Sequence, residues 1–159
     1  MTAEGVKDDV EIGEGTRIYG RVNLYGCRIG KNCTIGSFVE IRKTVSIGNN
    51  CKIGNGSEVK SSIIFDNSSV PHLSYIGDSI VGENVNIGGG TITANLRFDH
   101  ATIKVDIEGQ KIDSLRKKLG VIIGDGASLG INVSTMPGIW VWPNSRIKPG
   151  TVVYKDVKN

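Results

Sequence analysis

An aliphatic residue recurs at every sixth position over long stretches of this chain, and few folds can accommodate that spacing. The runs comprise Ile12, Ile18 and Leu24; Ile29, Ile35, Ile41, Ile47, Ile53 and Val59; Val81 and Ile87; and Ile123, Leu129, Thr135, Val141, Ile147 and Val153. The fifth position of each hexad holds a small or β-branched residue, such as Cys33, Val39, Cys51, Ser57 and Ile63. Both positions are predicted to face the interior of the fold.

The six-residue period predicts short strands separated by corners. It matches neither the 3.6-residue period of a helix nor the plain alternation of a long strand. Glycine often follows the aliphatic residue, as at Gly30, Gly36 and Gly48, and glycine adopts the backbone angles that a tight corner needs. Three such hexads per coil give a parallel β-helix, which is an all-β fold. Roughly seven coils stacked at about 4.8 Å would form a prism about 34 Å tall.

Two short slips interrupt the repeat. One residue is lost from the period between Leu24 and Ile29, and another around Pro71, Ile76 and Val81. Stacking of the coils is expected to be locally irregular at both places.

A longer interruption runs from residue 93 to residue 122. Within it, residues 103–107 alternate apolar with polar side chains, Glu108-Gly109 supplies a turn, and a basic run follows at 116–118. We therefore expect a protruding loop and hairpin over about residues 96–120. Long excursions from a rigid solenoid often carry binding function.

The bulk composition suits one domain over residues 1–159, long enough to bury a sizeable core. A formal net charge of +3 is too mild to favour binding to nucleic acid. No segment approaches the run of ~18 apolar residues that a membrane span needs, and the N-terminus MTAEGVKDD lacks a signal-peptide core. The sequence therefore predicts a soluble, cytoplasmic protein without a membrane partner.

The three cysteines contain no CxxC pair, so neither a disulfide framework nor a zinc site is predicted. Cys33 and Cys51 both occupy the inward fifth position, one coil apart, and are interpreted as buried thiols that act as small hydrophobes. Cys27 lies near the first slip and has no assigned role. A metal-dependent hydratase on such a prism would use three histidines, whereas this chain has only two, so no metal is expected.

One of those two histidines, His72, stands in the segment VPHLSYIGD; the other is His100. If Pro71 holds the first position of its hexad, His72 falls on the outward second position and Tyr75 on the fifth, pointing inward or between coils. A core histidine should occupy the first or the fifth position. We therefore interpret His72 as a functional residue that titrates near neutrality.

Four stretches of this sequence resemble a known family. They are FVEIRK (38–43), PHLSYIGD (71–78), VGENVNIGGGTITANLRFD (81–99) and KLGVIIGDGASLGINVSTMPG (118–138). Together they are similar to the acetyltransferase domain of the bifunctional N-acetylglucosamine-1-phosphate uridylyltransferase family, and most similar to the archaeal sugar-1-phosphate nucleotidylyltransferase/acetyltransferases. The resemblance implies that the β-helix is left-handed.

The resemblance also implies an activity. Members transfer an acetyl group from acetyl-CoA to the amine of an amino-sugar 1-phosphate, such as glucosamine-1-phosphate or galactosamine-1-phosphate, in a homotrimer with sites between neighbouring prisms. His72 matches the general base of the family and Asn95 a residue that holds the reacting groups. Tyr75 and Asn86 match residues that hold the sugar phosphate, and Arg42 stands where the family has a lysine.

Other positions depart from the family pattern. Leu24 replaces an arginine, which removes a phosphate contact that Arg97 or Lys104 is hypothesised to supply instead. The serine and alanine positions at the coenzyme fall on Ile131 and Pro149, and Pro149 has no backbone N–H to donate.

Three further observations keep other functions open. Trp140 and Trp142 are unusual in such a repeat, and Trp142 takes an outward position suited to a subunit contact or to the coenzyme. The changes at Leu24 and Pro149 would also suit a non-catalytic trimeric scaffold that partners a separate nucleotidylyltransferase. The opening RIYGRVNLYG resembles N-acetyltransferases of other amino-sugar nucleotides. No nucleotidylyltransferase motif occurs in residues 1–159, and the sequence leaves open whether the chain stands alone or is a fragment.

Overall fold

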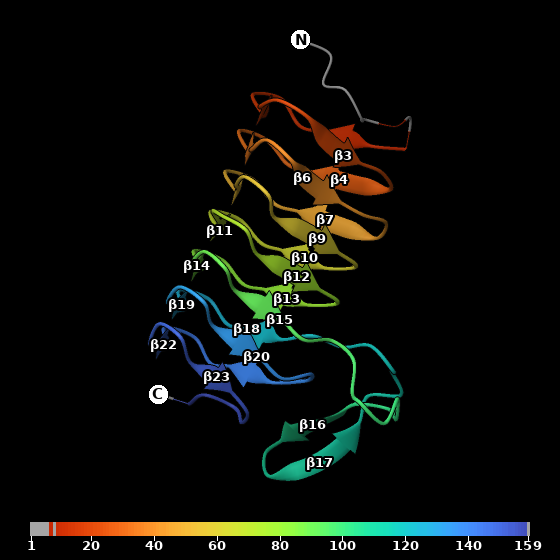
Figure 1. Ribbon diagram of the computed structural model, residues 1–159, viewed down its shortest axis with the longest axis vertical. Coiled ribbons are helices and arrows are strands. Elements are labelled where there is room, and N and C mark those ends of the chain that lie inside the picture. The colour runs from red at the N-terminus through yellow and green to blue at the C-terminus, as the bar shows by residue number, and fades with distance from the viewer. Residues whose placement is uncertain (1–6, 8, 159) are drawn as a thin grey trace.

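The computed structural model describes residue 7 and residues 9–158, and it is a left-handed parallel β-helix (Figure 1). Three parallel sheets, each with seven strands among the described residues, form the faces of a prism. Face 1 contains β1 (Glu11–Ile12), β4 (Cys27–Ile29), β7 (Val45–Ile47), β10 (Ile63–Ile64), β13 (Ile80–Val81), β18 (Ile122–Ile123) and β21 (Trp140–Val141). Face 2 contains β2 (Arg17–Ile18), β5 (Thr34–Ile35), β8 (Lys52–Ile53), β11 (Ser69–Val70), β14 (Asn86–Ile87), β19 (Ser128–Leu129) and β22 (Arg146–Ile147). Face 3 contains β3 (Val22–Leu24), β6 (Val39–Ile41), β9 (Glu58–Lys60), β12 (Tyr75–Gly77), β15 (Ile92–Thr93), β20 (Ser134–Thr135) and β23 (Val152–Val153).

The aliphatic first position of the hexad forms the core from Leu24 onwards, as predicted. In the first described coil the prediction is wrong for Ile12, which is 41% exposed because β1 is the edge strand of face 1. Ile35, Ile53 and Ile87 are fully buried and lie in register along face 2 with their counterparts in neighbouring coils. Burial of each such side chain stabilises the fold by roughly 1.5–3 kcal/mol. The described residues contain no helix with the length and apolarity required to cross a membrane.

The predicted register is wrong between Val59 and Val81. The step from Val59 to the next buried aliphatic residue, Ile64, is five residues rather than six, so Ile63 is 44% exposed and Ser62 takes the inward position. A second five-residue step separates Ile76 from Val81, which are both buried. Both steps shorten their coil from 18 to 17 residues, as the pairing of Ile63 with Ser46 illustrates.

The register between Val59 and Val81 is hard to predict from sequence because serine occupies inward positions in this stretch. Four serines, namely Ser62, Ser68, Ser74 and Ser79, occupy the inward fifth position. Each hydroxyl donates to a backbone carbonyl, as from Ser68 Oγ to the Gly82 oxygen at 2.7 Å. These hydrogen bonds satisfy the buried hydroxyls, so a residue common in loops can serve in the core.

The corrected register moves Pro71 to the second position, because Val70 is the buried first-position residue. His72 therefore occupies the third position and remains outward, whereas Ser74, not Tyr75, points inward. Tyr75 is half-buried on the outer surface of face 3. Pro71 accordingly lies in a regular hexad and not at a slip.

The predicted excursion leaves the prism after β15 and returns at β18. It carries the antiparallel hairpin of β16 (Lys104–Ile107) and β17 (Gln110–Asp113), which confirms the predicted loop and hairpin. We call residues 94–121 the arm; it projects beside the C-terminal coils (Figure 1).

The three cysteines are free and buried, which agrees with the structural role predicted for Cys33 and Cys51. The Cys33 thiol donates to the Gly48 carbonyl and the Cys51 thiol to the Phe65 carbonyl, both at 3.1 Å. Cys27, which had no predicted role, begins β4 and belongs to the same core.

Candidate functional site

His72 lies on the convex edge where face 2 turns into face 3, and its side chain is exposed. Its carbonyl accepts hydrogen bonds from the Gly90 amide at 3.1 Å and the Ser74 hydroxyl at 2.8 Å, which fix the backbone at this corner. Leu73 follows with φ of 47°, which turns the chain sharply onto face 3. We call this corner the 2/3 edge.

The coil below His72 presents only glycine at the same corner. A Cβ placed on Gly89 would lie 3.4 Å from the His72 Cβ, so the two residues are direct neighbours along the edge. Backbone hydrogen bonds continue the stack along the edge: the Asn132 amide donates to the Gly89 carbonyl at 2.9 Å, and the Gly150 amide donates to the Ile131 carbonyl at 2.8 Å. The three consecutive glycines at 88–90 leave the edge bare beneath the imidazole.

The two predicted coenzyme residues lie farther along this same edge. Ile131 is exposed, and Pro149 packs on Gly130 in the next coil. At about 4.8 Å per coil, Ile131 is about 10 Å and Pro149 about 14 Å from His72 along the axis. The structure thus brings His72, Ile131 and Pro149 onto one line, with the glycines between them.

On face 3, a polar network joins three consecutive coils. Asn95 Nδ2 donates to the Asp78 carboxylate at 2.6 Å and to the Tyr75 hydroxyl at 3.1 Å. The Lys60 ammonium pairs with the same Asp78 oxygen at 3.0 Å. The structure therefore brings together two of the candidate site residues, Tyr75 and Asn95, and joins to them an aspartate and a lysine that the sequence reasoning missed.

This network fixes the chemistry that Asn95 can offer. Both amide hydrogens of Asn95 have acceptors within the protein, at Asp78 and Tyr75. The remaining polar atom, Oδ1, is a hydrogen-bond acceptor. Asn95 is therefore suited to accept a hydrogen bond from a hydroxyl or an amine of a ligand.

Lys60 lies on the strand that neighbours Tyr75 on face 3, where it pairs in register with Gly77. The predicted cation, Arg42, lies one coil farther away and is held by Glu58 at 2.6 Å. A signal was available in the sequence: Glu-Val-Lys at 58–60 repeats Glu-Ile-Arg at 40–42 one coil later.

Asn86 and Leu24 stand apart from this network. Asn86 is exposed on face 2, on the other side of the 2/3 edge from Tyr75. Leu24 is fully buried in the core, so a side chain at this position faces away from any ligand outside the prism.

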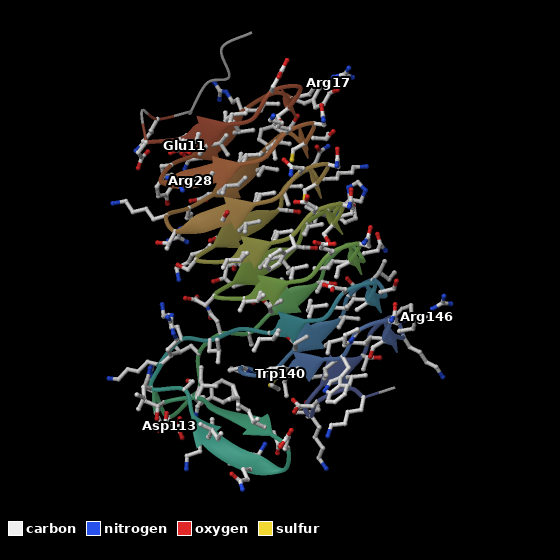
Figure 2. All side chains as sticks on the ribbon, turned by 180° about the vertical axis from the view of Figure 1, so that it is seen from behind. Glu11, Arg17, Arg28, Asp113, Trp140 and Arg146 are labelled. Carbon is white, nitrogen blue, oxygen red and sulfur yellow. The ribbon has the colours of Figure 1, made fainter. Side chains whose placement is uncertain are left out.

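The other predicted phosphate residues, Arg97 and Lys104, line a cleft of about 980 Å³ between the arm and the last coils. Arg97 binds the Asp99 carboxylate through two nitrogens, at 2.6 and 2.8 Å. These hydrogen bonds hold the pKa of Asp99 well below its usual range. Arg97 is thus engaged within the arm, whereas Lys104 begins the hairpin opposite Asp113. Figure 2 shows Asp113 on the arm and Trp140 on the last coils of the prism.

The two tryptophans occupy different environments. Trp142 is half-exposed, as its outward position predicts, and the Lys158 ammonium lies 5.3 Å from its ring centroid. The Trp140 backbone N–H donates to the Asp156 carboxylate at 2.9 Å, while its indole nitrogen is buried without a partner among the described residues.

Comparison with family models identifies the repeat. Residues 26–113 match the model of the GMPPB C-terminal domain, and residues 120–155 match the hexapeptide repeat of succinyl-transferase. The first match includes the prism from β4 to β15 and most of the arm, and the second covers the coils that follow the arm.

Curated relatives are also similar to this chain. The chain is 50% identical over 98 residues to a bifunctional sugar-1-phosphate nucleotidylyltransferase/acetyltransferase of Sulfurisphaera tokodaii, covering 62% of this chain and 24% of the relative. It is 51% identical over 100 residues to a bifunctional protein GlmU of Methanocaldococcus jannaschii, covering 63% and 24%. A GlmU of Heliobacterium modesticaldum is 36% identical over 149 residues, covering 94% and 29%. The chain spans about a quarter of the length of these curated relatives, which confirm the resemblance drawn from its motifs.

A solved structure supports the fold. The UDP-N-acetylglucosamine acyltransferase of Francisella novicida superposes with a TM-score of 0.55 at 18% identity, covering 96% of this chain and 61% of that one. At this identity the likeness concerns the prism alone. Because the matching family model covers more than half of the 159 residues, the chain belongs to the GMPPB C-terminal domain family of hexapeptide-repeat proteins.

Proposed function

We propose that this chain is an acetyltransferase that moves an acetyl group from acetyl-CoA to the amine of an amino-sugar 1-phosphate. One observation carries the proposal: His72 is exposed on the 2/3 edge, in line with Ile131 and Pro149 and above three glycines that leave room for a ligand. The relatives whose names include acetyltransferase activity are consistent with this assignment.

In the proposed reaction, the coenzyme arm runs along the 2/3 edge past Gly88–Gly90 and delivers its thioester beside His72. The amine nitrogen attacks the thioester carbonyl carbon, and the His72 imidazole accepts the proton that the nitrogen loses. As the C–N bond forms, the C–S bond breaks, and the departing thiolate takes up a proton. The products are the amide and free CoA thiol.

The acceptor sugar is proposed to lie over face 3. The Asn95 oxygen and the Tyr75 hydroxyl are placed to bind sugar hydroxyls, and Asn95 would orient the acceptor for attack. Lys60 and, one coil beyond, Arg42 are proposed to contact the phosphate as hydrogen-bond donors while paired with Asp78 and Glu58.

A single prism leaves this site open on one side, which supports a homotrimer with sites between neighbouring copies. Asn86 on face 2 and Tyr75 on face 3 diverge from the convex edge, so they cannot both enclose one ligand at His72. Phe38 and Leu73, on corners of the 2/3 edge, are 74% and 71% exposed. A second copy packed against these apolar side chains would supply the missing wall.

The test is release of CoA thiol from acetyl-CoA, measured by absorbance with a thiol reagent. Glucosamine-1-phosphate and galactosamine-1-phosphate are the expected acceptors, with UDP-linked amino sugars and unphosphorylated glucosamine in the same panel. Release that depends on a sugar 1-phosphate supports the proposal. Release only with nucleotide-linked sugars would assign the chain to the N-acetyltransferases of amino-sugar nucleotides instead.

A second candidate function is a non-catalytic trimeric scaffold that partners a separate nucleotidylyltransferase. Two observations favour it: Leu24 is buried where a phosphate contact was expected, and Pro149 lacks an N–H for the coenzyme. A protein that is trimeric by light scattering, yet releases no thiol with any acceptor, would favour the scaffold.

A further inference from the structure

The cleft between the arm and the C-terminal coils is separate from the His72 edge. It is lined by residues of the arm, such as Phe98 and Lys104, and by residues that follow β20 and β23, such as Met136 and Lys155. His72 does not line it. Its volume of about 980 Å³ lies at the upper end of the range for small-molecule sites.

The charge of the cleft is unbalanced. Two of its cations are neutralised in ion pairs, Arg97 with Asp99 and Lys111 with Asp106. The three other lysines, Lys104, Lys155 and Lys158, form no ion pair within the part of the chain that the structure describes. The one remaining carboxylate, Asp156, accepts the Trp140 amide. Two positive charges are therefore left over to meet a ligand with more than one negative charge.

Apolar and aromatic surface accompanies these charges. Phe98 is fully exposed at the arm, and Tyr154 is 70% exposed after β23. Both line the cleft, together with Leu96 and Met136. Exposed flat rings next to unpaired cations suit a ligand that combines a planar ring with phosphate groups.

The cleft is held open by a fixed contact at the base of the arm. Ile103 is fully buried and Val105 nearly so, and both rest on the turn at Gly138. The Gly138 amide also donates to the Gly120 carbonyl at 2.7 Å, where the arm rejoins the prism. The arm is therefore anchored, and the cleft needs no large rearrangement to admit a ligand.

We propose that this cleft binds a nucleoside diphosphate group. Lys155 and Lys158, with Lys104 across the cleft, contact the phosphates, and Phe98 and Tyr154 contact the base. The group could belong to free nucleotide, to a nucleotide-linked sugar or to the coenzyme, all of which share this chemistry. The proposal concerns binding and does not rest on acetyl transfer.

The experiment is a calorimetric titration of the purified full chain with ADP, with UDP and with inorganic phosphate. Saturable binding of at least one nucleotide, at least about tenfold tighter than phosphate, is expected because only the nucleotide contacts the rings. Trp142 gives a second signal, since Lys158 lies over its ring and a ligand that draws this lysine away changes the emission.

Lys155→Glu is the test variant, and it is expected to weaken nucleotide binding on the order of tenfold or more. Lys52→Glu is its matched control, because Lys52 is exposed on face 2, and its substitution makes the same charge change away from the cleft. Phe98→Ala should weaken binding of the nucleotide but not of phosphate. Melting temperatures within a few degrees of the parent protein establish that each variant folds.

Three results would overturn the proposal. They are the absence of saturable binding by both nucleotides, equal weakening by Lys155→Glu and Lys52→Glu, and loss of the oligomer in Phe98→Ala with nucleotide binding unchanged. The last result would assign the cleft to a second copy of this chain.

Competition identifies the source of the nucleotide once binding is established. Displacement of the bound nucleotide by CoA but not by UDP-glucosamine assigns the cleft to the nucleotide end of the coenzyme. The reverse pattern assigns it to a nucleotide-linked sugar. Because binding is measured without turnover, a chain that binds nucleotide but releases no thiol separates this proposal from the proposed acetyl transfer.

Discussion

At the scale of single residues, this chain separates groups that hold the fold from groups that are free to react. The buried serines and cysteines find carbonyl acceptors in the core, as Ser68 and Cys33 do. Within the described part of the chain, His72 makes its hydrogen bonds through its backbone, and its ring is left available. Substitution of a buried serine or cysteine should therefore lower stability, whereas substitution of His72 should lower activity and leave stability nearly unchanged.

His72→Ala should lower turnover by at least about a hundredfold, because general base catalysis typically contributes 10² to 10⁴ in rate. Its melting temperature should change little, since the side chain is exposed. Thiol release and thermal unfolding measure the two quantities, with His100→Ala on the arm as control. A large loss of stability with unchanged activity per folded molecule would make His72 structural.

Asp78 should act as a positioning residue, since one carboxylate oxygen binds both Lys60 and Asn95. Asp78→Ala frees the Asn95 amide to rotate, so we expect KM for the sugar phosphate to rise about tenfold, in line with loss of a charged hydrogen bond. The kcat should fall less. Asp78→Asn retains an acceptor oxygen and should recover part of the affinity; equal effects of both substitutions would contradict this role.

The Cys27 thiol gives a pH-dependent prediction. Burial, followed by the negative charge of Asp9, raises the pKa of Cys27 from 9.0 to about 11. A raised folded-state pKa stabilises the fold below pH 9, and this contribution is lost as the pH rises towards 11. Urea unfolding between pH 8 and pH 11 should show the decline, and Cys27→Ala should flatten it. An identical slope in the variant would place the titrating group elsewhere.

At the scale of elements, the arm depends on one turn of the prism. Gly138 has φ of 75°, and a Cβ on it would lie 2.5 Å from Ile103 Cγ2. The hairpin therefore rests on a glycine because no larger residue leaves room for Ile103.

Gly138→Ala should loosen β16 and β17 while the coils remain folded, and amide hydrogen exchange resolved by peptide measures this. Gly150→Ala is a close control: Gly150 has φ of 69°, so it carries similar backbone strain, but its Cβ would meet nothing within 4 Å. Faster exchange of the hairpin in both variants would show that strain rather than the contact with Ile103 is responsible.

Much of this architecture could be predicted from the sequence, because a period of six leaves few alternatives and Glu108-Gly109 supplies a turn between alternating strands. The register after Val59 could not be predicted, because Ser62 is of a residue type common in loops and Ile63 of a type common in cores, whereas the structure buries Ser62 and exposes Ile63. The repeat of Glu-Ile-Arg as Glu-Val-Lys indicates that Lys60 shares a face with Arg42, but its ion pair with Asp78 follows only from the pairing between coils. The roles of all the predicted site residues stay predictions.

At the scale of the whole molecule, the 2/3 edge should form the contact between copies. Phe38→Glu should convert the proposed trimer to monomer and abolish thiol release, because a charge replaces an exposed apolar side chain at the proposed interface. Phe65→Glu, on a corner between faces 1 and 2, should leave the oligomer intact. Light scattering reports the mass, and a trimeric, active Phe38→Glu protein would refute this interface.

The stacking of coils along the 2/3 edge also limits how the spacing of groups on this edge can change. The gap between His72 and Ile131 is a whole number of backbone spacings, because each corner bonds to the one below it. Adding or removing a coil alters that gap by about 4.8 Å and leaves the direction of every other side chain intact. The spacing between groups on this edge can therefore change only in whole coils, and each added or removed coil is 17 or 18 residues of chain.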